Sequence, residues 1–98
     1  MFLLLSRYLK PAEEVDRHLE AHRAFLDHQY ASGAFIVSGP LVPRTGGVIV
    51  TADLPRERLD AIMQDDPFVR EGVSAYEILE FSATKRAAGF LAALEANR

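Results

Sequence analysis

A histidine on the apolar side of an amphipathic stretch is the first residue of this sequence that could do acid–base chemistry. His22 is spaced with Leu19 and Leu26 as on one face of a helix, so its imidazole is expected to point inward with them. Such an imidazole either packs in the core with one hydrogen bond made or acts as a proton carrier. The second interpretation needs a carboxylate that binds one ring N–H, fixes the tautomer and leaves the other nitrogen free.

The Asp-Asp-Pro-Phe segment offers that carboxylate. Asp65 and Asp66 are adjacent and repel each other, so only one of them is expected to point into a pocket. Pro67 stiffens the segment and Phe68 is expected to anchor it in the core, and we choose Asp66 as the inward acid. The alternative is that the segment is a solvated turn or helix end, because Asp-Pro is common at both.

Two further places could contact a ligand. Ser38, Gly39 and Pro40 end an apolar run with a hydroxyl group and a glycine that permits close approach of a ligand, although the same residues also suit a simple turn. Arg7 could pair with an anionic substrate group, although a charge at a strand end often serves solubility alone.

Composition and motifs argue against several classes of function. The 98 residues carry a net charge of -3 with both signs interspersed, so there is no basic stripe for a nucleic acid. The chain has no cysteine, which fits a reducing compartment and predicts the cytoplasm. No apolar run is long enough for a signal peptide or a membrane span. His18 and His22 are one helical turn apart but lack a third ligand, and no nucleotide-binding motif is present, so we expect neither metal nor cofactor.

These residues must be positioned by elements that the apolar periodicity predicts. One domain over residues 1–98 is expected, with a core over 2–81. The expected strands are 2–8, 34–40, 46–52 and 72–81, and the expected helices are 11–32, 53–64 and 84–96, with residues 65–68 as a loop. The order β-α-β-β-α-β predicts an α+β, ferredoxin-like split βαβ fold: an antiparallel sheet with helices on one face, plus a C-terminal helix.

The predicted strands have apolar side chains at both parities, although helices would cover only one face of the sheet. Leu3 and Leu5 alternate with Phe2 and Leu4, for example. An uncovered apolar face is an association surface. We therefore expect a homodimer, joined through that face or through added strands and the terminal helix, with the ligand pocket near the joint.

The segments AHRAFLDHQYASGAFIVSGP, DDPFVREGV and YEILEF together resemble the YciI-like (YCII-related) family over about residues 2–81. The resemblance implies a ferredoxin-like, usually dimeric protein with a His–Asp pair in a cleft. The matching positions are His22, Asp66, the Gly39-Pro40 turn and Gly72. Phe68 and Gly72 thereby join Arg7 and residues 38–40 as candidate substrate-binding residues. Some members have an arginine where this chain has Leu19, and the terminal helix extends past the usual core.

A branch that resembles this family acts as a dehydrochlorinase, and the wider superfamily includes lactone isomerases. The resemblance thus implies a cofactor-free lyase or isomerase that acts on a small cyclic metabolite, with His22 as base and Asp66 as its orienting partner. Two alternatives belong to other classes: a dimeric protein that binds a small molecule without turnover, and a purely structural dimerisation module.

Overall fold

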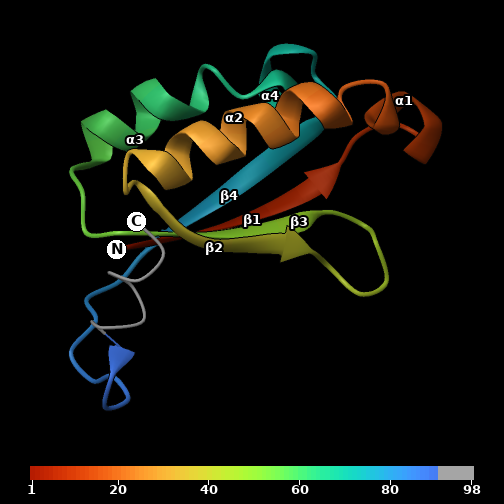
Figure 1. Ribbon diagram of the computed structural model, residues 1–98. Helices are drawn as coiled ribbons and strands as arrows, with labels where there is room; N and C mark the ends of the chain where they lie inside the picture. Colours follow the sequence, from red (N-terminus) through yellow and green to blue (C-terminus); the bar gives the residue numbers. More distant parts are fainter. Residues whose placement is uncertain (91–98) are drawn as a thin grey trace.

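A four-stranded antiparallel sheet covered by helices on one face forms the body of the protein (Figure 1). The structure is a computed structural model that describes residues 1–90. Its elements in chain order are β1 (Phe2–Tyr8), α1 (Ala12–Asp16), α2 (Leu19–Ala31), β2 (Phe35–Pro40), β3 (Gly47–Thr51), α3 (Arg56–Met63), α4 (Pro67–Arg70) and β4 (Ser74–Glu80).

The strand order is β2-β3-β1-β4, with β1 between β3 and β4 and every pairing antiparallel. The predicted ferredoxin-like α+β fold is confirmed by this arrangement. None of the helices within the described part of the chain is both long and apolar enough to cross a bilayer.

Alternation along β1 separates the two faces of the sheet. Phe2, Leu4 and Ser6 are buried beneath the helices, whereas Leu5 and Arg7 are exposed on the other face. This alternation is what a strand with one covered face requires. The main core lies between the sheet and the helices and is built from Phe2, Leu4, Phe25, Ala34, Phe35, Ile49, Leu54, Leu59 and Met63.

The helix predicted over residues 11–32 is wrong in one respect, because it is two helices. The chain leaves helical geometry at His18, with φ -107° and ψ 5°, and the amide of His18 bonds to the carbonyl of Val15 as in a tighter turn. The break lets Val15 pack in a second small cluster with Phe68 and Val73, while α2 packs Phe25 into the main core. Gly33, with φ 81°, follows α2 as the expected left-handed residue.

The face that α2 turns to the core also differs from the prediction. The buried residues of this helix are Phe25 and Gln29, whereas Leu19, His22 and Leu26 are only half buried. Leu19, His22 and Leu26 therefore lie on the side of α2 that lines a cavity. This side is adjacent to the one that packs into the core.

Three other segments depart from the expected boundaries. Residues 53–55 precede α3, which begins at Arg56 after the extended Pro55. The segment expected to be a loop begins the short helix α4, with Asp66 as its N-cap and Pro67 in its first turn, where a missing N–H has no cost. Residues 84–89 are not helical, so the C-terminal helix does not begin at Thr84, and residues 91–96 of that prediction lie outside the described residues.

Candidate functional site

The imidazole of His22 and the carboxyl group of Asp66 meet between α2 and α4. His22 Nδ1 lies 2.8 Å from Asp66 Oδ1, although the two residues are 44 positions apart in the chain. The Asp66 side chain is fully buried, and 12% of the His22 side chain is exposed. Nδ1 is the ring nitrogen that faces Asp66, so a proton held there leaves Nε2 as the nitrogen available to a ligand.

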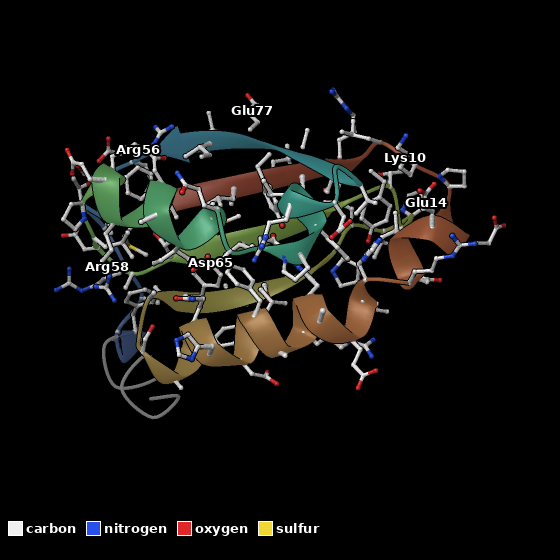
Figure 2. All side chains as sticks on the ribbon, turned by 90° about the horizontal axis from the view of Figure 1, so that it is seen from above. Lys10, Glu14, Arg56, Arg58, Asp65 and Glu77 are labelled. Atoms are coloured by element: carbon white, nitrogen blue, oxygen red, sulfur yellow. The ribbon has the colours of Figure 1, made fainter. Side chains whose placement is uncertain are left out.

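Asp66 is held at this place by its position as the N-cap of α4. Its Oδ1 accepts a hydrogen bond from the backbone N–H of Phe68 at 2.9 Å, as N-cap carboxylates do. Its Oδ2 accepts a second bond from the hydroxyl of Tyr76 on β4, at 2.8 Å. Two donors and the His22 ring nitrogen thus converge on one buried carboxyl group, and a carboxylate, which only accepts, is satisfied at all three contacts when Nδ1 holds the imidazole proton. Neighbouring Asp65 is exposed, on the helical side of the molecule (Figure 2).

The hydroxyl of Tyr76 is a permanent donor in this arrangement. Burial of the phenol, together with the charge and hydrogen bond of Asp66, raises the pKa of Tyr76 far above its ordinary value. The phenol therefore stays protonated at any physiological pH, and Oδ2 of Asp66 always has a donor.

Phe68 holds the other partner of the pair. Its ring lies parallel to the imidazole of His22, with 3.9 Å between the ring centroids and 3° between the planes. Phe68 is itself buried in the second cluster with Val15 and Val73, and Tyr8 packs against this cluster. The imidazole is thus fixed by a hydrogen bond at its edge and by a flat contact over its face.

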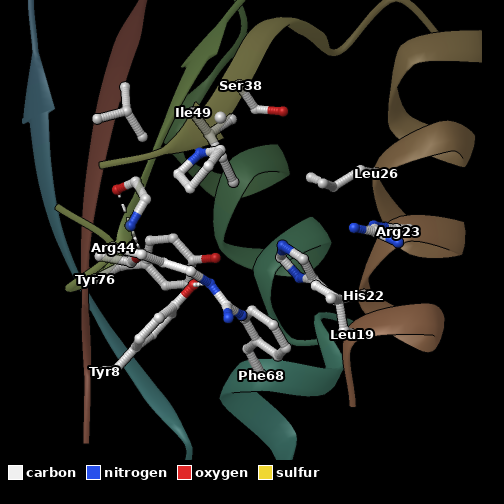
Figure 3. A pocket seen from close by; sticks show the side chains of 15 residues that line it. Tyr8, Leu19, His22, Arg23, Leu26, Ser38, Arg44, Ile49, Phe68 and Tyr76 are labelled. Carbon is white, nitrogen blue, oxygen red and sulfur yellow. Dashed lines mark hydrogen bonds between the residues drawn. The ribbon is translucent and has the colours of Figure 1, made fainter. Parts of the chain in front are cut away.

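A cavity of about 400 Å³ opens in front of His22 (Figure 3). Helix α2 forms one wall, the covered face of the sheet forms the floor, and the β2–β3 loop closes one end. The lining residues are Ser6, Tyr8, Leu19, His22, Arg23, Leu26, Ser38, Gly39, Pro40, Arg44, Gly47, Val48, Ile49, Phe68 and Tyr76. The volume suits a small cyclic molecule, and the walls are mostly apolar with a few polar groups, as is usual for ligand sites.

Of the residues predicted to bind substrate, Ser38, Gly39, Pro40 and Phe68 line this cavity. Ser38 is placed there by its pairing with Ile49 on β3, and its hydroxyl is hydrogen-bonded to the hydroxyl of Tyr30.

Arg7 and Gly72 are not at the cavity. Arg7 alternates with Ser6 on β1 and so projects from the uncovered face of the sheet. Gly72 follows α4 with φ +67°, a left-handed conformation that glycine adopts without strain, and it is not one of the residues that line the cavity. The expectation that these two residues bind substrate is not supported by their placement.

Several lining residues were not singled out from the sequence. Tyr76 shares its parity on β4 with Ile78, so its inward orientation could be predicted from the sequence. Its contact with Asp66 depends on how α4 packs against the sheet, which the sequence does not indicate. Arg44 lies in the β2–β3 loop, where no periodicity indicates direction, and Arg23 follows His22 on α2. Within residues 1–90, no three histidine or acidic side chains are grouped as a metal-binding set.

Comparison with known proteins places the chain in a family. The model of the YCII-related domain matches residues 1–82, so the protein belongs to the YCII-related family. Among solved structures, the chain is similar to 5-chloro-2-hydroxyhydroquinone dehydrochlorinase from Burkholderia phenoliruptrix AC1100, solved in complex with 2,5-dihydroxybenzoquinone. The TM-score is 0.68 at 20% sequence identity, over 84% of this chain and 94% of that one, a likeness of fold. No curated protein sequence matches the chain.

Proposed function

We propose that the protein is a cofactor-free lyase or isomerase in which His22 moves a proton on a small cyclic substrate bound in the cavity. The observation that carries the proposal is the buried Asp66 carboxyl group 2.8 Å from His22 Nδ1, with the imidazole forming part of the cavity wall. A carboxylate in this position directs Nε2 at the ligand and stabilises the imidazolium that forms when Nε2 accepts a proton.

The proton transfer balances in either reaction class. In an elimination, Nε2 takes a proton from a substrate O–H or C–H, the released electron pair forms a new double bond, and a chlorine leaves with its bonding pair as chloride. In an isomerisation, Nε2 takes a proton from one carbon and returns it to another. The fold shared with a dehydrochlorinase favours the first class as the starting point for tests.

The test is turnover of a panel of chlorinated hydroxyhydroquinones and cyclic lactones, followed by chloride release and by product spectra. 5-Chloro-2-hydroxyhydroquinone belongs in the panel because the structural neighbour acts on it. We expect turnover by the unaltered protein and a loss of about 10²- to 10⁴-fold in kcat for His22→Gln, the usual contribution of a general base. Glutamine keeps much of the shape of histidine and some hydrogen bonding, so ligand binding should survive.

His28→Gln is the matched control. His28 lies on the same helix, is exposed and does not line the cavity, so this variant should react at the rate of the unaltered protein. Turnover that persists in His22→Gln would overturn the role given to His22. Binding of panel members without turnover, in the unaltered protein as in the variant, would instead favour a protein that binds a small molecule without reaction.

We also propose that a second copy of the chain covers the open face of the sheet. Leu5, Val37, Leu79 and Phe81 are between 36% and 54% exposed, all on strands or at a strand end. The same face has Arg7 on β1 and Glu77 on the neighbouring β4, two exposed residues of opposite charge (Figure 2 labels Glu77). A two-fold axis through this face can set Arg7 of each copy against Glu77 of the other, so the surface is complementary to itself.

A further inference from the structure

Two arginines stand at the cavity, and none of the described residues that line it is acidic. Arg23 projects from α2 beside His22, and Arg44 reaches in from the β2–β3 loop (Figure 3). The chain as a whole is acidic, with 14 Asp and Glu against 11 Lys and Arg, so this gathering of positive charge is local. The carboxyl group of Asp66, which contacts His22, is fully buried behind the imidazole and is not exposed to the cavity.

The side chain of Arg44 is held in place rather than left loose in solvent. Its Nη2 donates to Asp16 Oδ1 at 2.6 Å and its Nε donates to the hydroxyl of Tyr8 at 3.2 Å. Its guanidinium carbon also lies 5.3 Å from the centre of the Tyr8 ring, within range of a cation–π contact. The arginine therefore bridges from the loop to α1 with its orientation fixed before any ligand arrives.

This arrangement leaves capacity for a ligand. A guanidinium has five N–H donors, and the described residues use one at Nε and one at Nη2. Three N–H groups remain, two on Nη1 and one on Nη2, and a planar carboxylate can accept two parallel hydrogen bonds from one N–H on each of these nitrogens. Asp16 is 47% exposed, so water screens the charge with which it offsets that of Arg44. Arg23 has no ion-pair partner within residues 1–90.

We infer that the ligand of this cavity is a cyclic organic acid whose carboxylate binds Arg44, with Arg23 adding charge at the cavity wall. The apolar body of the ligand packs against Leu19, Leu26 and Ile49, and its reacting edge faces His22. Asp16 and Tyr8 are positioning residues that hold Arg44. This inference rests on the proposed function for its reacting edge, but the preference for an anion depends on the arginines alone.

The experiment measures binding of benzoate, 2-hydroxybenzoate and cyclohexanecarboxylate by calorimetry, each against its neutral carboxamide. We expect each acid to bind more tightly than its amide, and the preference to weaken as salt is added, because these charges are partly exposed. Arg44→Gln should reduce the affinity for the acids about tenfold or more, because a charge-assisted hydrogen-bonded pair is lost. The affinity for the amides should not change. Arg44→Lys, which keeps a point charge without the fork, should fall between the two.

Arg56→Gln is the control for an arginine lost elsewhere. Arg56 is exposed on α3, pairs with Asp60 and does not line the cavity, so its variant should bind the acids as the unaltered protein does. His22→Gln should also retain acid binding, which separates the two proposals. Acid binding that depends on Arg44 in a protein without turnover would support this inference and overturn the proposed reaction. Equal affinities for acids and amides, or an unaltered affinity in Arg44→Gln, would overturn this inference even where His22-dependent turnover is found.

Discussion

The imidazole of His22 lies flat on the phenyl ring of Phe68, with 3.9 Å between centroids and 3° between planes. The backbone N–H of the same Phe68 donates to Asp66 Oδ1, the oxygen that also faces His22 Nδ1. One residue thus fixes both members of the pair, the imidazole through its ring and the carboxyl group through its main chain. Both contacts follow from the turn that starts α4.

Replacement of Phe68 by leucine separates these two roles. Phe68→Leu keeps the backbone N–H and an apolar side chain but removes the flat surface under the imidazole. We expect a loss of roughly 1–2 kcal/mol in the free energy of unfolding, from poorer packing and the lost ring contact. The imidazole should gain rotational freedom, visible as broadened His22 ring signals in NMR. Val69→Ala, an exposed neighbour on the same helix, should change neither property. Unaltered ring signals in Phe68→Leu would show that the hydrogen bond to Asp66 alone orients His22.

Replacement of Asp66 by asparagine should lower stability but leave the proton of His22 on Nδ1. An amide has one acceptor oxygen and a donor NH₂ group, so it cannot satisfy all three donors that Asp66 accepts. We expect Asp66→Asn to cost roughly 1–3 kcal/mol of unfolding free energy, the penalty for one buried polar group left unpaired. Nitrogen-15 NMR of the neutral imidazole should report Nδ1–H in both proteins. The N–H of Phe68 requires the amide oxygen at the Oδ1 position, beside His22, and the NH₂ group then faces the Tyr76 hydroxyl, which can accept. A shift toward Nε2–H in the variant would contradict the role given to the Phe68 N–H in fixing which atom of residue 66 faces His22.

Much of this fold was predictable because its signals are local. The alternation of β1, the left-handed Gly33 after α2 and the order of the elements follow from short-range patterns. The break at His18 was not predictable, since it accompanies packing of Val15 against Phe68 and Val73, residues far away in the sequence. The cavity was hidden for a related reason. Leu19, His22 and Leu26 have the spacing of a buried helix face. The sequence cannot distinguish a helix face that packs against other side chains from one that lines a cavity, as these residues do.

The candidate site residues likewise divide into those with a local sequence signal and those positioned by contacts between distant parts of the chain. Asp66 was chosen over Asp65 for its place next to Pro67, but its role as the N-cap of α4 was not predicted, because residues 65–68 were expected to form a loop. Arg44 offered no such signal, because loop conformation depends on tertiary contacts such as those with Asp16 and Tyr8. The parity of Arg7 on β1 places its side chain on the face opposite to the cavity, because one residue along a strand turns a side chain to the other face.

The raised pKa of Tyr76 predicts how stability changes at alkaline pH. Above about pH 10, where an exposed phenol ionises, the unfolded chain releases a proton that the folded protein retains. Stability from this group is fully present below that pH and falls as pH rises, by at most about 1.4 kcal/mol per pH unit. Tyr76→Phe lacks the hydroxyl, so it should be less stable than the unaltered protein at pH 7 by roughly 1 kcal/mol. Urea unfolding from pH 7 to 11 should show this gap constant up to pH 9 and narrowing above pH 10. A constant gap at every pH would contradict the burial argument.

The proposed dimer predicts that either charge reversal alone, at Arg7 or at Glu77, prevents dimerisation and that the two together restore it. Arg7→Glu would set two carboxylates against each other across the two-fold axis, and Glu77→Arg would likewise oppose two guanidinium groups. We expect both single variants to dissociate at concentrations where the unaltered protein sediments as a dimer. The double variant recreates opposite charges across the axis with their positions exchanged, so it should dimerise again. Neither residue lines the cavity, so the fold and the His22–Asp66 contact should be intact in all three variants. A monomeric unaltered protein would refute the dimer, and a double variant that stays monomeric would refute the pairing of Arg7 with Glu77 that places the axis.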